Sequence, residues 1–323
     1  PVEIQAKPVS EKAIAVTVVN PLSRSVSGTV RFGTGETPFA LAPVESTVLE
    51  MPMPQALEPG CVTAVDLPVV VRIGGRDFSV PCAFRALPVR RVRPGFDWKD
   101  VPVTQLPNDV TPCANPRRMR APQPWGGPDD LSAACQLAWN EDALYYRLTV
   151  RDDAFALCLN EKWGHYAWYA NDSVQLFFDT FGDGPAKRLS GLEGPDENDM
   201  SYELLPTNET SAIVFRRRAP DFQLTGGVGW GLRPDTIETN VVCRFAWDPE
   251  TRTRTYETAF PRFYIQPMTL AKGSTPGFAT MVFDRDVPTE PSKQYLTDVD
   301  KSKGGSVGIL VCPSVYLPVH ILA

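Results

Sequence analysis

Short runs in which apolar and polar residues alternate follow one another along the chain. In the first part the ranges 25–32 and 46–51 are of this kind, and alternation with period 2 is typical of half-buried β-strands. The range 13–19 (AIAVTVV) is a further β-rich run, which ends at Asn20-Pro21. The range 69–73 is followed by Gly74-Gly75 and a second β-rich run over 76–80. These two runs predict a hairpin, because the primed turns that join β-strands need positive φ, which glycine adopts readily. About seven such strands predict an immunoglobulin-like sandwich.

The second part of the chain repeats this pattern with longer strands. The ranges 136–139 and 144–150, joined by an acidic turn, predict a hairpin, and the range 172–179 predicts a strand with Val174, Leu176 and Phe178 facing the core. Ser173, Gln175, Phe177 and Asp179 then share the opposite face of that strand. Further strands are expected at 201–205, 211–215, 240–247, 254–260, 278–283 and 307–312. Since no segment keeps a 3.6-residue period, we predict an all-β chain with two antiparallel β-sandwiches, of which the second is the larger.

A proline- and arginine-rich segment separates the two parts. Residues 88–94 read PVRRVRP and show no hydrophobic period, so they are expected to form a linker. We therefore predict an immunoglobulin-like domain over 1–92 and a larger β-sandwich domain over 93–323. The chain has 32 prolines among its 323 residues, which agrees with many short elements joined by turns.

The charge pattern argues against nucleic acid as a partner. The formal net charge is −6, whereas nucleic-acid binding needs a basic face. The one basic cluster, Arg216-Arg217-Arg218, is interpreted as a solvated strand end. No apolar run reaches the roughly 18 residues that a membrane-spanning helix needs, so no membrane partner is expected. The chain starts with Pro1 and not Met, and we expect it to be a piece of a longer polypeptide.

The seven cysteines show neither a disulfide framework nor a zinc pattern. None are paired as CxxC, and none lie at zinc spacing from a histidine. Cys82, Cys135, Cys243 and Cys312 lie in apolar strand patterns, where a free cysteine behaves as a small hydrophobic residue. The spacing leaves one or two disulfide bridges open.

The second part resembles the family 9 carbohydrate-binding modules and their relatives among the DOMON-like sandwiches. The resemblance rests on an ordered set of motifs. These are Trp98, the range 137–145 (LAWNEDALY), Asp152-Asp153, the range 168–179 (WYANDSVQLFFD), the range 256–260 (YETAF) and the range 277–284 (GFATMVFD). The resemblance implies a sandwich fold and non-catalytic carbohydrate binding, in which two aromatic rings enclose a sugar while polar side chains bond its hydroxyl groups.

Carried over residue by residue, the resemblance implies a ligand site near the start of the Asp172–Asp179 strand. The first ring corresponds to Tyr169 or Trp168, within an aromatic loop that also contains Trp163, and the family glutamate corresponds to Gln175. The family has a glutamine where this chain has Met281, and the second ring has Tyr295 as its substitute. These departures imply an altered specificity or a lost site.

The resemblance also implies a metal, a location and a context. Structural calcium is common in the family, and the acidic ranges 179–184 and 196–199 place Asp179, Asp183 and Asp196 as candidate ligands, since calcium takes oxygen ligands. The chain is expected outside the cell, at the cell surface or in the periplasm. There it would serve as an accessory region of a larger secreted polysaccharide-active protein, with an upstream catalytic domain in the same polypeptide.

Three other functions stay open. A catalytic function would need a base or a pair of carboxylates. The candidate bases are His165 and His320, and the candidate carboxylates are Asp172 and Glu203. The sequence contains no GxSxG motif. Some DOMON-like domains bind haem between a histidine and a methionine, which would use His165 and Met281. The third function is purely structural, with both domains acting as spacers and binding no ligand.

Overall fold

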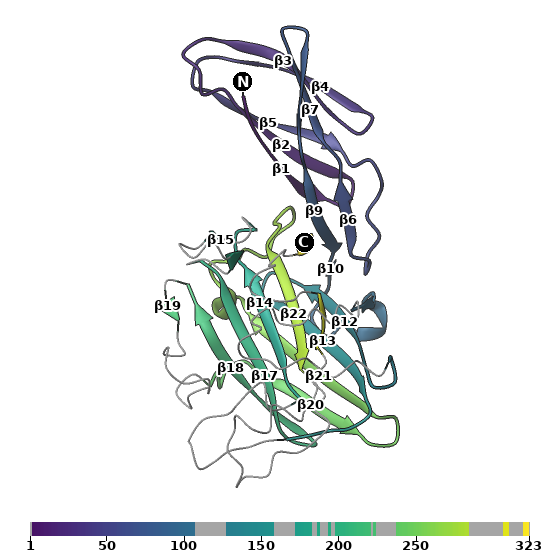
Figure 1. The fold of residues 1–323 in the computed structure, drawn as a ribbon. Coiled ribbons are helices and arrows are strands. Elements are labelled where there is room, and N and C mark those ends of the chain that lie inside the picture. Colours follow the sequence, from purple (N-terminus) through teal and green to yellow (C-terminus); the bar gives the residue numbers. More distant parts are fainter. Residues whose placement is uncertain are drawn as a thin grey trace, which may run out of the picture. The chain divides into compact units, whose positions relative to one another are not determined.

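The computed structural model describes residues 2–106, 127–157, 172–182, 198–220 and 237–283, and in addition the backbone of five short strands outside these ranges. The fold is all-β, as predicted (Figure 1). The chain divides into two compact units. Unit 1 comprises residues 1–89, 271–275 and 319–323, and unit 2 comprises residues 90–270 and 276–318.

Unit 1 contains two small antiparallel sheets and a further group of three paired strands. Its strands are β1 (Glu3–Ser10), β2 (Ala13–Val19), β3 (Val26–Phe32), β4 (Gly35–Leu41), β5 (Ser46–Pro52), β6 (Thr63–Asp66), β7 (Val69–Ile73), β8 (Arg76–Val80), β9 (Ala83–Pro88) and β24 (Val319–Leu322). The sheet orders are β1-β2-β5 and β4-β3-β7-β8, and β9 pairs with β6 and, in parallel, with β24. The immunoglobulin-like description of this unit stays a prediction.

The predicted Gly-Gly hairpin of unit 1 is confirmed. Strand β7 pairs with β8 in antiparallel register, and the φ angles of Gly74 and Gly75 are 57° and 77°. Both angles lie in the left-handed region that glycine enters without a steric cost. The predicted linker, in contrast, is partly built into strands, because Pro88 ends β9 and Arg90–Arg91 form β10, which pairs with β12 of unit 2.

A glycine in β3 allows two strands to approach closely. A Cβ atom placed on Gly28 would lie 2.1 Å from the carbonyl oxygen of Arg72 on β7. We expect Gly28→Ala to lower the free energy of unfolding of unit 1 by about 1–3 kcal/mol, since the backbone must shift to accommodate the methyl group. Chemical denaturation checks this, with the exposed neighbour Ser27→Ala as the control. Equal losses in the two variants would contradict it.

Unit 2 contains the longer strands and, in the part of it that the structure describes, two 3₁₀ turns. Its elements are β10 (Arg90–Arg91), η1 (Trp98–Asp100), β11 (Thr104–Gln105), β12 (Leu131–Trp139), β13 (Ala143–Asp152), β14 (Val174–Asp179), β15 (Ala186–Lys187), β16 (Glu193–Gly194), β17 (Met200–Asn208), β18 (Ser211–Ala219), β19 (Phe222–Gln223), β20 (Cys243–Asp248), β21 (Thr253–Pro261), η5 (Arg262–Ile265), β22 (Gly277–Phe283) and β23 (Ser306–Ile309). Among the described residues, no helix has the length and apolar character that a membrane crossing requires.

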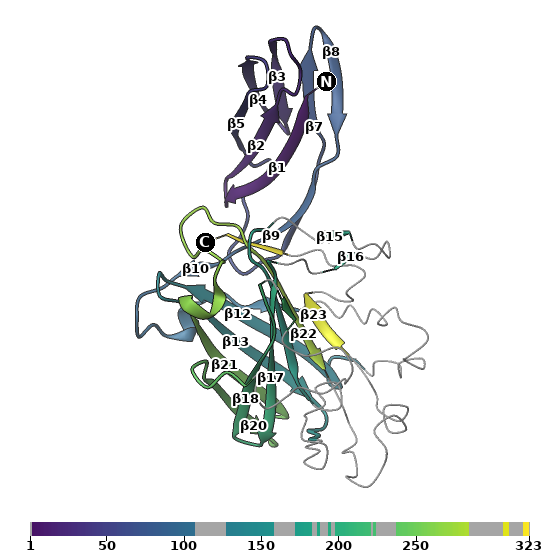
Figure 2. The same ribbon diagram turned by 90° about the vertical axis from the view of Figure 1, so that its left-hand side faces the viewer.

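The main sheet of unit 2 curls until its two halves face each other. The strand order is β12-β13-β21-β20-β18-β17-β14-β22, and β23 continues it beside β22 (Figure 2). Strands β13 and β22 are far apart in this order, yet the hydroxyl groups of Tyr146 and Thr280 lie 2.8 Å apart. The ring of Phe260 on β21 likewise lies 4.9 Å from that of Tyr202 on β17. The sheet is therefore an antiparallel sandwich, which confirms the predicted fold class of this part.

The core of this sandwich contains the residues that the alternation placed inward. The inward residues of β13 (Leu144, Tyr146, Leu148, Val150) and of β14 (Val174, Leu176, Phe178) are all fully buried. Two cysteines join this core, since Cys135 and Cys243 are buried and not disulfide-bonded. Burial raises the pKa of each of these thiols to about 12, so both act as small apolar side chains, as the sequence predicted.

Candidate functional site

A fully buried arginine joins two strand ends in unit 2. Arg254 on β21 contacts Asp152 at the end of β13, and its Nη1 lies 3.3 Å from the Oδ1 atom of Asp172. All three side chains are 0% exposed. Burial of charges is tolerated when they are paired and hydrogen-bonded, so these residues form one electrostatic unit, the Arg254 clamp.

The Arg254 clamp holds both ends of the segment that contains the aromatic loop. Asp152 precedes this segment, and its Oδ1 accepts the backbone N–H of Ala154 at 2.9 Å. Asp172 follows the segment, and its Oδ2 accepts the N–H of Ala156 at 2.5 Å. The hydroxyl of Tyr256 donates to the carbonyl oxygen of Asp172 at 3.0 Å. The two ends of the 153–171 segment are thus fastened to β21.

The outer face of β14 is polar and also buried. Ser173 and Asp179 are 0% exposed and Gln175 is 5% exposed, although they lie opposite the apolar core residues of the same strand. The sequence predicted this face but not its burial. A polar strand face that is removed from solvent must satisfy its groups internally or with a bound molecule.

Gln175 lies at the middle of this face. Strand β14 lies between β17 and β22 in the sheet (Figure 1). Gln175 is in register with Glu203 on β17 and with Met281 on β22, and directly opposed residues of paired strands share a face. Among the described residues, no group forms a hydrogen bond with the side-chain amide of Gln175. A primary amide offers two donors and one acceptor, so this nearly buried group has unused bonding capacity.

Glu203 is the carboxylate beside Gln175. The hydroxyl of Ser173 donates to its Oε1 at 2.8 Å, and Nη1 of Arg217 lies 3.6 Å from its Oε2. Full burial raises the pKa of Glu203 to about 8, and the attraction of Arg217 and the Ser173 hydrogen bond only partly offset this effect. Burial also lowers the pKa of Arg217. Near neutral pH a large share of Glu203 is therefore protonated and uncharged.

The arginine triplet is not a solvated strand end, and that interpretation was wrong. Arg216, Arg217 and Arg218 lie within β18 and are each partly buried. Arg216 pairs with Glu238 at 2.7 Å, while Arg217 pairs with Glu203. The alternation of charged and apolar residues in this region gave no sign of the acidic partners, because both come from distant positions in the sequence.

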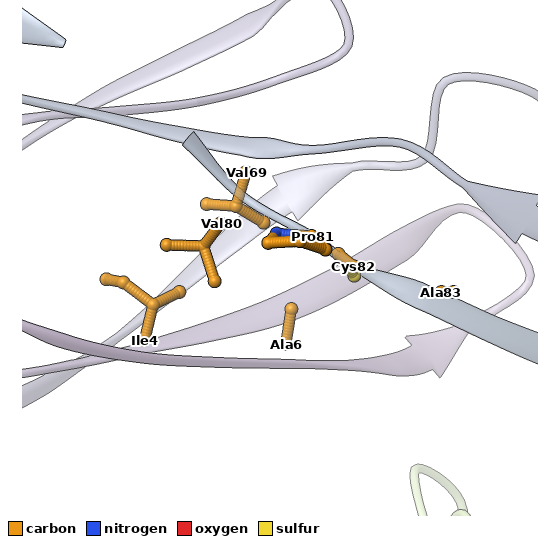
Figure 3. A pocket seen from close by; sticks show the side chains of 7 residues that line it. All are labelled: Ile4, Ala6, Val69, Val80, Pro81, Cys82 and Ala83. Atoms are coloured by element: carbon orange, nitrogen blue, oxygen red, sulfur yellow. The ribbon is translucent and has the colours of Figure 1, made fainter. Parts of the chain in front are cut away.

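A cavity of about 140 Å³ lies in unit 1 (Figure 3). Its lining consists of Ile4, Ala6, Val69, Val80, Pro81, Cys82 and Ala83. These side chains are uncharged and mostly aliphatic, and burial raises the pKa of the Cys82 thiol. The cavity thus has no polar side chain that would orient a polar ligand.

A family comparison assigns the larger part of the chain. The model of the family described as carbohydrate family 9 binding domain-like matches residues 113–303, which is more than half of the sequence. The chain belongs to this family. The match confirms the resemblance to family 9 modules and covers every residue that the sequence predicted for ligand or calcium binding. No curated protein matches the chain.

Two solved structures of family 9 modules are similar to this chain. Both are carbohydrate-binding modules of family 9 from Caldicellulosiruptor kristjanssonii, one in complex with cellotriose and one in complex with glucose. The cellotriose complex is 13% identical with a TM-score of 0.43, and 73% of this chain and 92% of that chain are covered. The glucose complex is 14% identical with a TM-score of 0.40, and 73% and 95% are covered.

Most of the family-implied site lies outside the described residues. This applies to Trp163, Trp168, Tyr169 and Tyr295, so their role as ring platforms stays a prediction. Gln175 is described, and the two strands that flank it place Glu203 and Met281 beside it.

The structure also shows a stacked aromatic pair next to the Arg254 clamp. The rings of Phe155 and Trp247 are 5.4 Å apart at an interplanar angle of 24°, and both side chains are half-buried. Trp247 is in register with Arg254 across β20 and β21. The sequence analysis did not single out this pair, because the two residues are 92 positions apart.

Of the three aspartates that the family resemblance predicts as calcium ligands, the structure describes one. Asp179 is fully buried, and its Oδ1 accepts the N–H of Gly182 at 2.7 Å, which closes a turn after β14. Asp183 and Asp196 lie outside the described residues. Among the residues that are described, no group of three or more His, Cys, Asp or Glu side chains is placed to hold a metal ion. Calcium therefore stays a prediction, and Asp179 has a structural role in the turn.

Proposed function

We propose that unit 2 binds carbohydrate without chemical turnover, at the outer face of β14. The observation that carries the proposal is the Gln175 amide, which is 5% exposed and has no hydrogen-bond partner among the described residues. Sugar hydroxyl groups need short, directed partners of this kind, and the apolar faces of a sugar ring stack on aromatic side chains. Membership in a family named for carbohydrate binding and the predicted rings of Trp168 and Tyr169 support the same ligand class.

The carboxylates that could serve a glycosidase are already engaged. Asp172 belongs to the Arg254 clamp, and Glu203 is bonded to Ser173 and paired with Arg217. Hydrolysis of a glycosidic bond uses two carboxyl groups that flank the bond. Because both candidates have structural partners, a binding function fits them better than an acid–base function.

We expect Gln175→Ala to lower the affinity for a bound glycan about tenfold, since an amide that bonds two hydroxyl groups contributes roughly 1–2 kcal/mol. A glycan array with the whole chain, followed by affinity gel electrophoresis, identifies the glycan and measures this loss. Trp168→Ala and Tyr169→Ala test the predicted rings in the same assay, and the exposed Gln5→Ala in unit 1 is the matched control. If Gln175→Ala and Gln5→Ala bind equally well, the site is elsewhere.

A structural function without a ligand is the second candidate. The full burial of Ser173 and Glu203 favours it, because these two side chains bond each other without a ligand. A folded chain that binds no glycan on the array would support this spacer function over the first proposal. Haem binding through His165 and Met281 is tested by the absorbance spectrum of the purified protein, since bound haem gives a strong Soret band. His165 lies outside the described residues.

We extend the first proposal to the setting of the chain, which is an accessory region of a larger secreted polysaccharide-active protein. It would act outside the cell, at the cell surface or in the periplasm. The family match supports this setting only through the ligand class. Fractionation of the source cells, with detection of the native polypeptide, tests both the location and the presence of a catalytic domain in the same chain.

A further inference from the structure

Polar and apolar side chains on the outer face of β14 differ in exposure, and in an unusual direction. The polar residues Ser173, Gln175 and Glu203 have exposed fractions of 5% or less. The apolar residues Phe177 and Met281 on the same face are half-buried and keep part of their surface accessible. The usual order is the reverse, since charged and amide side chains are mostly exposed in proteins. A ligand that approaches this face therefore meets apolar surface around a nearly buried amide.

Strand pairing brings a third half-buried apolar residue to the same place. Met281 is directly opposite Gln175 in the register of β14 with β22. Phe283 shares the face of Met281, because the two are separated by two positions on β22, and its backbone N–H donates to the carbonyl oxygen of Ser173 at 2.8 Å. Diagonal neighbours on a sheet are about 7–8 Å apart, which is within reach of an aromatic side chain. Phe177, Met281 and Phe283 thus lie next to Gln175 along β14 and across to β22.

The two strands beside Gln175 offer a ligand different neighbours. On β17, Glu203 is 0% exposed, accepts a hydrogen bond from the Ser173 hydroxyl at 2.8 Å and lies 3.6 Å from the Arg217 guanidinium. Its carboxyl group is thus engaged within the protein. On β22, Met281 presents a partly accessible thioether, which has no hydrogen-bond donor and is only a weak acceptor. A group bonded to the Gln175 amide therefore has Met281 as its accessible neighbour.

The position of Met281 discriminates between sugar substituents. Directly opposed Cβ atoms of paired strands are about 5 Å apart, so a sugar ring that bonds Gln175 also covers Met281. A hydroxyl group placed over the thioether would leave water without a strong partner, which costs free energy. A methyl group in the same place is removed from water favourably, and methionine adapts its shape to such contacts.

We infer that the sugar bound beside Gln175 carries a methyl group, which lies over Met281 while the Gln175 amide bonds a neighbouring hydroxyl group. The inference rests on the proposed function, and it specifies the ligand class of that same site. The methyl group of a 6-deoxy sugar and that of an N-acetylated sugar share this chemistry, and the ligands used in the test distinguish these two sources.

The test compares sugars that differ in one methyl-bearing substituent. Isothermal titration calorimetry on the whole chain uses L-fucose with L-galactose and L-rhamnose with L-mannose, in which a methyl group replaces the hydroxymethyl group. N-acetyl-D-glucosamine with D-glucose forms the acetyl arm. We expect the methyl-bearing member of at least one pair to bind at least about tenfold more tightly. The pair that shows this preference identifies the deoxy or the acetyl source.

Two substitutions at Met281 separate the contact with the sugar from folding. Met281→Gln replaces the thioether with an amide, and it is expected to remove or reverse the preference for the methyl-bearing sugar. Met281→Leu keeps an apolar side chain and is expected to keep the preference. Val242→Gln, the same kind of change at an exposed apolar position before β20, is the matched control and leaves the preference unchanged. Thermal denaturation of each variant verifies that it is folded.

Equal binding of the two members of every pair, or tighter binding of the hydroxylated members, would overturn the inference while the proposed function stands. A glycan from the array that binds through Gln175 and carries no methyl group would do the same, as would a folded Met281→Gln variant that retains the preference. Failure of the chain to bind any of these sugars and any glycan on the array would instead reject the proposed function, and the inference with it.

Discussion

Replacing Arg254 with methionine is expected to lower the free energy of unfolding of unit 2 by about 3–5 kcal/mol. The substitution leaves Asp152 and Asp172 without their cationic partner while both remain 0% exposed. Removing one member of a buried charge cluster is costly because the remaining charges stay buried and lose the opposite charge that offset them. Urea denaturation followed by tryptophan fluorescence measures the change.

The matched control for this prediction is Arg147→Met. Arg147 on β13 pairs with Glu257 on β21 at 3.3 Å, but their side chains are 33% and 28% exposed. Such a pair contributes less than about 1 kcal/mol, because solvent screens it. If Arg254→Met loses no more stability than Arg147→Met, the clamp has no special role. The variant in which Arg254, Asp152 and Asp172 are all neutralised is expected to recover much of the loss.

The stability of the chain is expected to fall as pH rises from about 4.5 to 8, through the titration of Glu203. Burial raises the pKa of Glu203 from its ordinary value of 4.5 to about 8 in the folded chain. Between these values the folded state holds a proton that the unfolded state has released, so each increase in pH favours unfolding. The contribution that is lost across this range is on the order of 4 kcal/mol.

The Glu203→Gln variant isolates this effect. The amide has the shape of the protonated acid and does not titrate, so the difference in stability between the variant and the original chain should be small at pH 4. It should grow in favour of the variant up to pH 8 and then level off. Urea denaturation at five pH values measures it, with Glu257→Gln on the half-exposed face as the control. A difference that grows in favour of the original chain would mean that the ionised carboxylate stabilises the fold.

The strand positions could be predicted from the sequence because they depend on local alternation. In β13 the residues Leu144, Tyr146, Leu148 and Val150 face the core as expected, and the Gly-Gly turn forms where the positive φ angles require it. The burial of the opposite face of β14 could not be predicted in this way. Alternation tells which residues share a face, whereas the exposure of that face depends on what packs against it.

The burial of Arg254 could have been predicted from the sequence. The β21 sequence TRTYETAFP places Arg254 at the same parity as Tyr256, Thr258 and Phe260, and all four are buried. An arginine at a core-facing strand position requires a buried acidic partner. The family motifs already included Asp152 and Asp172, so the pairing could have been proposed, although not its geometry.

The pairing of Arg217 with Glu203 had no comparable signal in the sequence. Three consecutive arginines in a strand would normally alternate between the two faces, and the sequence does not show where an extra residue is inserted into a strand pair. The pairing of β17 with β18 shifts in register between Ser201 and Tyr202, and this β-bulge is a long-range property. The sequence alone therefore predicts solvent-exposed charges here, whereas the structure pairs Arg216 with Glu238 and Arg217 with Glu203.

The parallel pairing of β24 with β9 determines how the chain would respond to a mechanical load. The strand Val319–Leu322 near one terminus and the strand Glu3–Ser10 near the other both belong to unit 1. Tension applied at these two strands loads the pairing of β24 with β9. Four register pairs bear this load before β24 separates from β9.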